Sequence, residues 1–206
     1  MHIISHRGYW QKSDEKNCGV AFRRSFDFNF GTETDIRDSN GQLVISHDMP
    51  TGNEMLLADL LKILDNRNLT LALNIKADGL ATQLKKTMRA MALDSWFVFD
   101  MSIPDMQLYL QENIPVFVRM SEVEKEPPWF TQAVGVWLDG FSTWYDESLV
   151  RSLLREGKKV CVVSPELHKR EHRTHWKMLL PLSEHPSLML CTDYPEEARG
   201  FFGEQQ

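Results

Sequence analysis

The feature that most constrains the fold of this chain is a regular alternation of short strand-like runs with segments of helical spacing. Several of the runs are almost uniformly apolar, which is typical of parallel strands covered on both faces. Eight runs are predicted as strands: His2–His6, Thr32–Arg37, Thr70–Lys76, Trp96–Asp100, Pro115–Met120, Val134–Asp139, Lys159–Val163 and Ser187–Thr192.

Between these runs, leucines and methionines recur at intervals of three and four residues, which predicts amphipathic helices. Ser102 is the expected N-cap of one helix, and Gly157 the stop of another. The stretch Glu122–Gln132 contains Pro127 and Pro128, so a short or irregular connection is expected there. The predicted helical segments are Met55–Asp65, Gly79–Leu93, Ile103–Gln111 and Asp146–Glu156.

Strands that alternate with helices imply right-handed parallel crossovers. Eight such units predict the α/β class, as a compact (β/α)8 TIM barrel that forms a single domain over residues 1–206. An open doubly wound sheet is the alternative. That fold normally carries a glycine-rich phosphate loop after an early strand, and Gly8 stands alone at that place. The barrel is therefore the preferred prediction.

Composition limits the partners of the chain. Hydrophobic residues make up 42% and charged residues 25%, as in ordinary globular proteins. The net charge of −6 disfavours a nucleic-acid binder, which needs a cationic surface. No apolar run approaches the ~18 residues of a membrane span, and the first residues lack a signal-peptide pattern. We therefore expect a cytoplasmic protein whose partner is a small molecule, with neither a membrane nor a nucleic acid involved.

Polar residues gather where the predicted strands end, and in a barrel the reactive groups lie at these carboxyl ends. Glu33 and Asp35 are two residues apart on a strand, so their side chains share one face. If that face is the interior, the two carboxylates need a proton or a cation to offset their repulsion. Hard oxygen ligands suit Mg²⁺ or Ca²⁺. The alternative is a pair of outward, solvated acids.

Two histidines and two cations follow the same strand ends. His6 and His47 are candidates for proton transfer, because imidazole both accepts and donates a proton near neutral pH. Arg7 and Lys76 would place positive charge beside the acids, as an anionic phosphate group requires. Each of these four residues also has a simpler interpretation as an ordinary surface group.

Two further stretches lie at the predicted barrel mouth. Three aromatic residues lie close to the predicted mouth at the sixth strand: Trp137, Trp144 and Tyr145. Stacking on a sugar or base is one interpretation, and packing is the preferred one. The stretch Ser164–Arg173 follows the seventh strand and carries Lys169, Arg170 and Arg173. It is a candidate for binding a distal anionic group, although a solvated charged loop is slightly favoured.

Several motifs occur in a fixed order along the chain: Ser5-His6-Arg7-Gly8, Asn17-Cys18-Gly19-Val20-Ala21-Phe22, Glu33-Thr34-Asp35 followed after eleven residues by His47-Asp48, Leu73-Asn74-Ile75-Lys76, and Thr192-Asp193-Tyr194-Pro195. Together they resemble the glycerophosphodiester phosphodiesterase family, which belongs to the phospholipase-C-like phosphodiesterase barrels. The first three motifs are the specific part of this resemblance.

The resemblance implies a role for each matched residue. Glu33 and Asp35 would be ligands of a divalent cation, with Asn74 at the place of a third ligand. His6 and His47 would be the general acid and base, and the phosphate would be neutralised by Arg7 and Lys76. The implied function is a metal-dependent phosphodiesterase that hydrolyses a small soluble phosphodiester similar to a glycerophosphodiester.

Two departures from the family pattern leave alternatives open. Asn74 stands where the family has a glutamate, which removes one negative charge from the ligand set. Lys16 reverses a charge in the stretch where the family has Pro-Glu-Asn-Thr, which suggests a different head group. The alternatives are a catalytically inactive barrel that binds phosphate and metal, and a lyase that stops at a cyclic phosphate.

Overall fold

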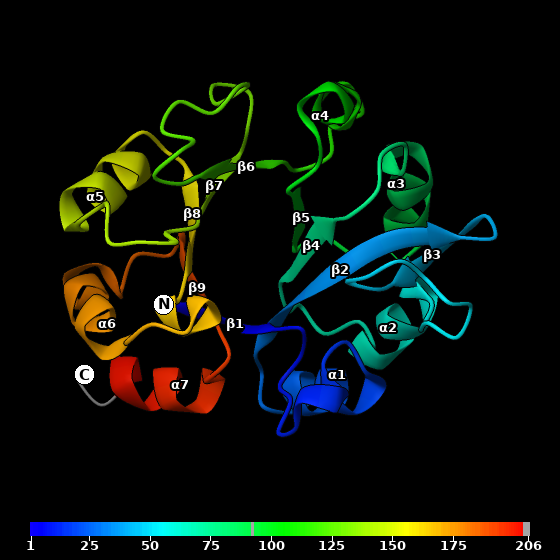
Figure 1. The fold of residues 1–206 in the computed structure, drawn as a ribbon, viewed down its shortest axis with the longest axis horizontal. Helices are drawn as coiled ribbons and strands as arrows, with labels where there is room; N and C mark the ends of the chain where they lie inside the picture. Colours follow the sequence, from blue (N-terminus) through cyan, green and yellow to red (C-terminus); the bar gives the residue numbers. More distant parts are fainter. Residues whose placement is uncertain (92, 204–206) are drawn as a thin grey trace. The chain divides into compact units, whose positions relative to one another are not determined.

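The computed structural model describes residues 1–91 and 93–203. Backbone contacts divide the chain into two compact units (Figure 1). The N-terminal unit is His6–Val116, and the C-terminal unit combines Met1–Ser5 with Phe117–Gln206.

The N-terminal unit is built on the parallel strands β2, β4 and β5, with β4 between the other two. All five residues of β4 are buried, as expected for a strand covered on both faces. Helices α1 and α2 pack against each other (Figure 1). The elements are a 3-10 helix at Ser13–Glu15, α1 (Gly19–Asp27), β2 (Gly31–Ser39), β3 (Gln42–Ile45), α2 (Leu57–Leu64), β4 (Leu71–Ile75), α3 (Ala81–Ala90), β5 (Trp96–Phe99) and α4 (Ile103–Gln111).

The C-terminal unit has its strands in the order β1-β9-β8-β7-β6, and all of these pairs are parallel. Helix α5 packs on β8. The elements are β1 (His2–His6), β6 (Phe117–Met120), β7 (Gly135–Leu138), α5 (Glu147–Arg155), β8 (Lys159–Val163), 3-10 helices at Pro165–His168 and Leu180–Leu182, α6 (Arg173–Leu179), β9 (Leu188–Thr192) and α7 (Pro195–Gly203).

The predicted fold class, an α/β chain with the strand and helix order of a compact (β/α)8 TIM barrel, is confirmed. Each of the eight predicted runs contains a parallel strand, and each of the four predicted helical segments contains a helix. Ser102 caps α4 as predicted, because its hydroxyl oxygen accepts a hydrogen bond from the Asp105 N–H at 3.3 Å. Ala92, within the predicted segment Gly79–Leu93, lies outside the described residues. The single domain stays a prediction.

Among the described residues, one strand and three α-helices were not predicted, namely β3, α1, α6 and α7, and neither were the three 3-10 helices. Strand β3 forms an antiparallel hairpin with β2, and its turn places Asn40 and Gly41 at φ values of 51° and 77°. Helix α1 begins after Cys18, whose side chain makes no capping hydrogen bond. The segment Glu122–Gln132 is irregular, as predicted.

Within residues 1–91 and 93–203, the helices lack the length and apolar character that crossing a bilayer requires.

Candidate functional site

A tight turn after β1 holds His6 and Arg7 against β2. Arg7 has a φ of 58° and Gly8 a φ of 84°, both in the left-handed region. A Cβ at Gly8 would lie 2.8 Å from the Cβ of Ala21, so this position requires glycine. The backbone N–H of Arg7 donates to the Glu33 carbonyl oxygen at 3.0 Å and lies 3.2 Å from its Oε2. The turn thereby fixes the first motif beside the Glu33 carboxylate.

The two acids of β2 are buried. Their relative exposures are 2% for Glu33 and 0% for Asp35, so they are not the outward, solvated pair of the alternative interpretation. Burial raises the pKa of Glu33 well above its ordinary value, and the charge of Asp35 raises it further. The charges of Arg7 and Lys76 act in the opposite direction. A proton or a bound cation is therefore needed to stabilise this carboxyl group.

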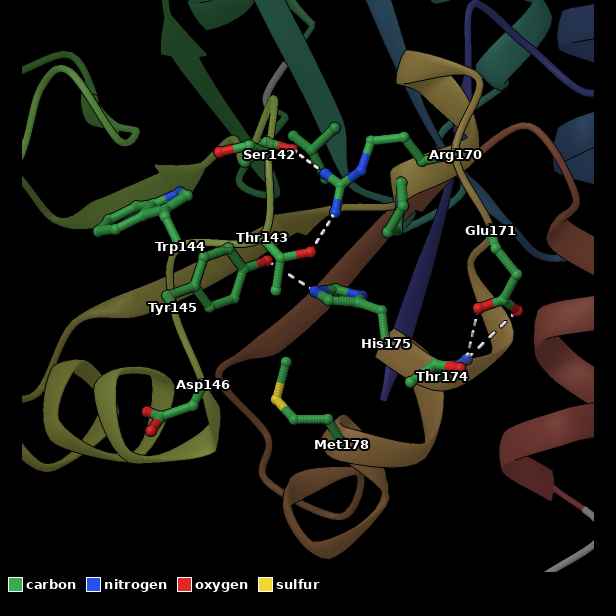
Figure 2. A pocket seen from close by; sticks show the side chains of 13 residues that line it. Ser142, Thr143, Trp144, Tyr145, Asp146, Arg170, Glu171, Thr174, His175 and Met178 are labelled. Carbon is green, nitrogen blue, oxygen red and sulfur yellow. Dashed lines mark hydrogen bonds between the residues drawn. The ribbon is translucent and has the colours of Figure 1, made fainter.

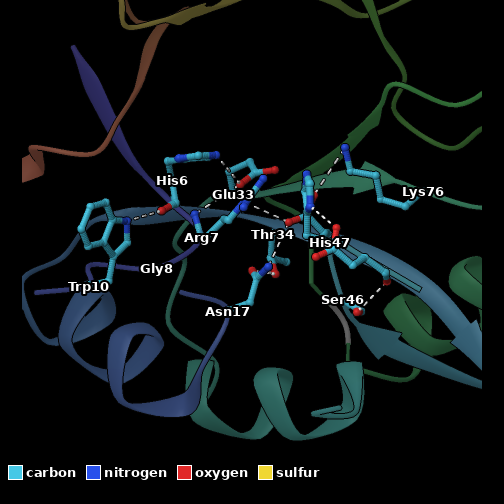
Figure 3. Close-up of polar contacts among 12 residues, drawn as sticks. His6, Arg7, Gly8, Trp10, Asn17, Glu33, Thr34, Ser46, His47 and Lys76 are labelled. Carbon is cyan, nitrogen blue, oxygen red and sulfur yellow. Dashed lines mark hydrogen bonds and ion pairs between the residues drawn. The ribbon is translucent and has the colours of Figure 1, made fainter. Parts of the chain in front are cut away.

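Asp35 is surrounded by positive charge and by a side-chain amide. Arg7 Nε lies 3.1 Å from Asp35 Oδ2, and Lys76 Nζ lies 3.5 Å from Asp35 Oδ1. Asn17 Nδ2 donates to Oδ2 at 2.9 Å. Figure 3 shows the side chains of Arg7, Asn17 and Lys76, with dashed lines for the polar contacts among the residues drawn. Arg7 and Lys76 are thus partners of a buried acid, unlike ordinary surface cations.

His6 stands at the edge of this charged group. Its Nε2 lies 3.9 Å from Glu33 Oε2, and its side chain is 16% exposed. Trp10 Nε1 donates to the His6 carbonyl oxygen at 3.2 Å, which holds the backbone in place (Figure 3). The imidazole therefore contacts both the buried acid and solvent, as a proton carrier requires.

His47 reaches the site through the β2–β3 hairpin. The antiparallel register brings the chain back so that the Ser46 N–H donates to the Asp35 carbonyl oxygen at 3.1 Å. His47 follows directly, with its Nδ1 2.9 Å from Asp48 Oδ1 and its side chain 45% exposed. Two N–H groups of Arg37 donate to the His47 carbonyl oxygen.

A cavity of about 550 Å³ has both Arg7 and His47 in its wall. Ion pairs bring five of the predicted site residues together: His6, Arg7, Glu33, Asp35 and Lys76. His47 stands apart from that group of pairs, since its own charged partner in the described chain is Asp48.

Residues at the end of β4 supply a further oxygen donor. Asn74 is paired with Asp35 in the parallel register of β4 and β2. Asn74 Oδ1 and Asp35 Oδ1 are both buried, and neither has a hydrogen-bond partner in the described part of the chain. Buried oxygens that accept no hydrogen bond fit a hard divalent cation.

The described residues contain no cluster of three or more His, Cys, Asp or Glu side chains suited to a metal ion. At this site the third candidate donor is an amide, because Asn74 takes the place of an acid. The available set, Glu33, Asp35 and Asn74, fits Mg²⁺ or Ca²⁺ better than Zn²⁺.

Asn17 is a site residue to which the sequence analysis gave no role, although it lies in a matched motif. Besides its bond to Asp35, its Oδ1 accepts from the Thr34 hydroxyl at 2.8 Å. Asn17 thus links the loop before α1 to two residues of β2. Its neighbour Lys16 lies over the Trp10 ring, 4.3 Å from the centroid, and borders the cavity.

Comparison with solved structures shows which proteins share this fold. The chain matches glycerophosphodiester phosphodiesterases from Parabacteroides distasonis ATCC 8503, with a TM-score of 0.71 over 99% of this chain and 97% of that one, and from Agrobacterium tumefaciens str. C58, with 0.72 over 99% and 98%. It also matches an Oleispira antarctica phosphodiesterase in complex with its product sn-glycerol-3-phosphate, with a TM-score of 0.69 over 98% and 97%. Identity is 14% in each case.

The chain has the fold of these phosphodiesterases. The predicted resemblance is thus confirmed at the level of structure. No protein-family model matches the sequence, and a search of curated proteins also gives no match.

Proposed function

We propose that this chain is a divalent-metal-dependent phosphodiesterase that hydrolyses a small phosphodiester of the glycerophosphodiester kind. The observation that carries the proposal is the buried Glu33 and Asp35 pair, with Arg7 and Lys76 as its cations and His6 beside it. The structural likeness to glycerophosphodiester phosphodiesterases supports it, as does the sn-glycerol-3-phosphate found in the related Oleispira antarctica phosphodiesterase.

Glu33, Asp35 and Asn74 would hold Mg²⁺ or Ca²⁺. When bound, such an ion supplies Lewis-acid stabilisation of the negative charge that develops on the phosphoryl oxygens. The raised pKa of Glu33 fits this role, because a cation replaces the proton that the buried carboxyl group would otherwise retain.

Arg7 and Lys76 would bind and orient the phosphate. Both side chains are about a fifth exposed while their charged ends lie at Asp35, so they border the buried acids and still reach a ligand. Charge-assisted hydrogen bonds from such groups position a phosphoryl oxygen and stabilise its charge in the transition state.

His6 and His47 would exchange protons with the substrate. One takes a proton from the attacking water as its oxygen bonds to phosphorus. The other gives a proton to the leaving alkoxide as the second P–O bond breaks. The contact of His47 Nδ1 with Asp48 favours a tautomer whose Nε2 is available for this transfer.

Two other functions are favoured by particular features of the chain. Asn74 is neutral where the family has a glutamate, so the ligand set carries one negative charge fewer. This difference suits a barrel that binds a phosphodiester without turnover. A substrate hydroxyl could replace water as the attacking group, which would give a cyclic phosphate.

The cytoplasmic location and the small-molecule partner stay predictions from the sequence.

Phosphorus NMR of the products tests the proposed function. Purified protein is incubated with glycerophosphodiesters that carry different alcohols, with Mg²⁺ or Ca²⁺ present. We expect a phosphomonoester and a free alcohol. His6→Ala should slow turnover by about 100-fold or more. His2→Ala, an exposed change on the same strand, should leave the rate unchanged.

Two other outcomes would exclude hydrolysis as the reaction. A cyclic phosphate as the end product identifies a lyase. A diester that binds and is released unaltered identifies a binding protein. Turnover that survives His6→Ala at the wild-type rate would contradict the assigned role of His6.

A further inference from the structure

Two cavities differ in whether the charged groups of their walls already have partners. In the C-terminal unit, a cavity of about 480 Å³ lies beside the segments that follow β7 and β8 (Figure 2). Arg170 donates two hydrogen bonds to other groups of this wall, each at 2.8 Å. Asp146 caps α5, and Glu171 accepts from the Thr174 N–H. These charges are satisfied by the protein itself, so they do not select a ligand.

The cavity of the N-terminal unit differs, because Lys16 brings a charge without a partner to its wall. This cavity, of about 550 Å³, is the one that Arg7 and His47 also line. The Lys16 ammonium group makes no ion pair and donates no hydrogen bond among the described residues, and its nitrogen is not buried. A positive charge is therefore available to a ligand at this wall.

The Trp10 ring holds this ammonium group beside the turn after β1. Lys16 Nζ lies 4.3 Å from the centroid of the ring, which is a cation–π contact. The indole N–H of Trp10 donates in turn to the His6 carbonyl oxygen at 3.2 Å (Figure 3). The position of the Lys16 charge is thus tied to the turn that carries His6 and Arg7.

Backbone contacts also bring Lys16 close to Arg7. The N–H of Asn17, the next residue, donates to the Arg7 carbonyl oxygen at 2.9 Å. Arg7 Nε lies at Asp35, whereas its two terminal nitrogens are not buried and donate no hydrogen bond within the described chain. Arg7 can therefore contact a phosphoryl oxygen while Lys16, on the same wall, contacts another part of the same molecule.

The two acids of this wall already have partners. Asp48 Oδ1 lies 2.9 Å from His47 Nδ1, and the Asp48 side chain is 93% exposed. Glu54 accepts hydrogen bonds from the Thr51 hydroxyl and from the Gly52 N–H, both at 2.9 Å. The unpartnered Lys16 ammonium group therefore favours a negatively charged group on the ligand.

We propose that Lys16 selects phosphodiesters whose alcohol carries a further negative charge, such as a carboxylate. The phosphoryl group would lie at Arg7, and the carboxylate would accept a charge-assisted hydrogen bond from Lys16 Nζ. This inference rests on the proposed phosphodiesterase function and specifies the class of alcohol in its substrate.

Three diesters of glycerol phosphate test the role of Lys16, because they differ in the charge of the second alcohol. This alcohol is glycolate, which is anionic, glycolamide, which has nearly the same shape and is neutral, or ethanolamine, which is cationic. We expect wild type to prefer the glycolate diester. The measured quantity is the ratio of kcat/KM for the glycolate diester to kcat/KM for the glycolamide diester.

Three variants isolate the charge. Lys16→Met keeps a long side chain over Trp10 and removes the charge, so it should lower the ratio about tenfold. Lys16→Glu should lower the ratio further and raise kcat/KM for the ethanolamine diester relative to the glycolamide diester. Lys12→Met is the matched control, because Lys12 is exposed and lies outside the cavity wall, and it should leave the ratio unchanged.

Titration calorimetry separates this inference from the proposed function. The same diesters are bound to His6→Ala, with and without Lys16→Met, so that turnover does not interfere. The added change should weaken binding of the glycolate diester about tenfold and binding of the glycolamide diester little. If wild type hydrolyses none of the diesters, the proposed function fails, and these affinities still decide the role of Lys16.

Three results would overturn the inference. An unchanged ratio in Lys16→Met would show that its charge does not select the alcohol. An equal loss for all three diesters would show that Lys16 binds the phosphate they share. Binding of none of them would remove this cavity as the site. If Lys16→Met fails to fold, Lys16→Gln is the second variant, with the same expected ratio.

Discussion

At the residue scale, His175 couples the stability of the C-terminal unit to pH. Burial and then the charge of Arg170 lower its pKa to about 4, against an ordinary value of 6.5. The unfolded chain therefore binds a proton at this residue over a pH range in which the folded chain does not. The free energy of unfolding should fall as pH is lowered from about 6.5 to about 4, by roughly 2–3 kcal/mol from this residue alone.

Urea unfolding of wild type and His175→Phe across this pH range isolates the effect. Above about pH 6.5 the stability difference between the two proteins should be constant. Below it, the wild type should lose stability faster than the variant, because the variant has no proton to take up at this position. Parallel pH dependences for the two proteins would show that His175 ionises normally in the folded state.

Single-residue patterns predicted part of the candidate site. The two-residue spacing of Glu33 and Asp35 put both side chains on one face, and strand geometry makes that inference reliable. The contact of Asn17 with Asp35 joins a loop to a strand. Periodic sequence patterns do not predict contacts between a loop and a strand. The sequence signal for Asn17 was its place in a matched motif.

At the element scale, the β2–β3 hairpin determines where His47 lies. Its turn residues, Asn40 and Gly41, both have positive φ, as the tight two-residue turn of a hairpin requires. Because Ser46 bonds to the Asp35 backbone, the length and register of the hairpin set the position of the next residue, His47. A distortion of the turn should therefore act on the site at the other end of the strands.

Gly41→Val tests this connection. A β-branched residue at a φ of 77° is strained, so the variant should lose about 1–2 kcal/mol of stability and shift the His47 ring resonances in NMR spectra. Gly41→Asn is the matched control, because asparagine tolerates the left-handed region, and it should retain most of the wild-type behaviour. An undisturbed His47 spectrum in the Gly41→Val variant would show that the hairpin does not position that residue.

Local sequence signals account for some of the elements that were predicted. Helices α4 and α5 were both predicted, and the cap of α4, Ser102, was predicted with it. The structure adds that Asp146 caps α5. Helix α1 lacks a side-chain cap. Strand β3 has only four residues, and the Asn40-Gly41 pair before it is the local signal from which such a hairpin can be predicted.

At the scale of the whole molecule, the alternation of strands and helices was enough to predict the (β/α)8 class. Parallel strands in such a fold are buried on both faces, and the resulting apolar runs are visible in sequence. The structural likeness extends over nearly the full chain at 14% identity, so very different sequences form this fold. The proposed function rests on the few residues gathered around Glu33 and Asp35.

The most direct measurement of the central claim is the metal dependence of turnover. Protein is stripped of divalent ions with a chelator, and hydrolysis of a glycerophosphodiester is followed as Mg²⁺ or Ca²⁺ is restored. We predict that activity disappears on chelation and returns with the ion. Glu33→Gln should need about 10–100 times more metal for the same rate. Full activity in the stripped protein, or none with either ion, would contradict the account.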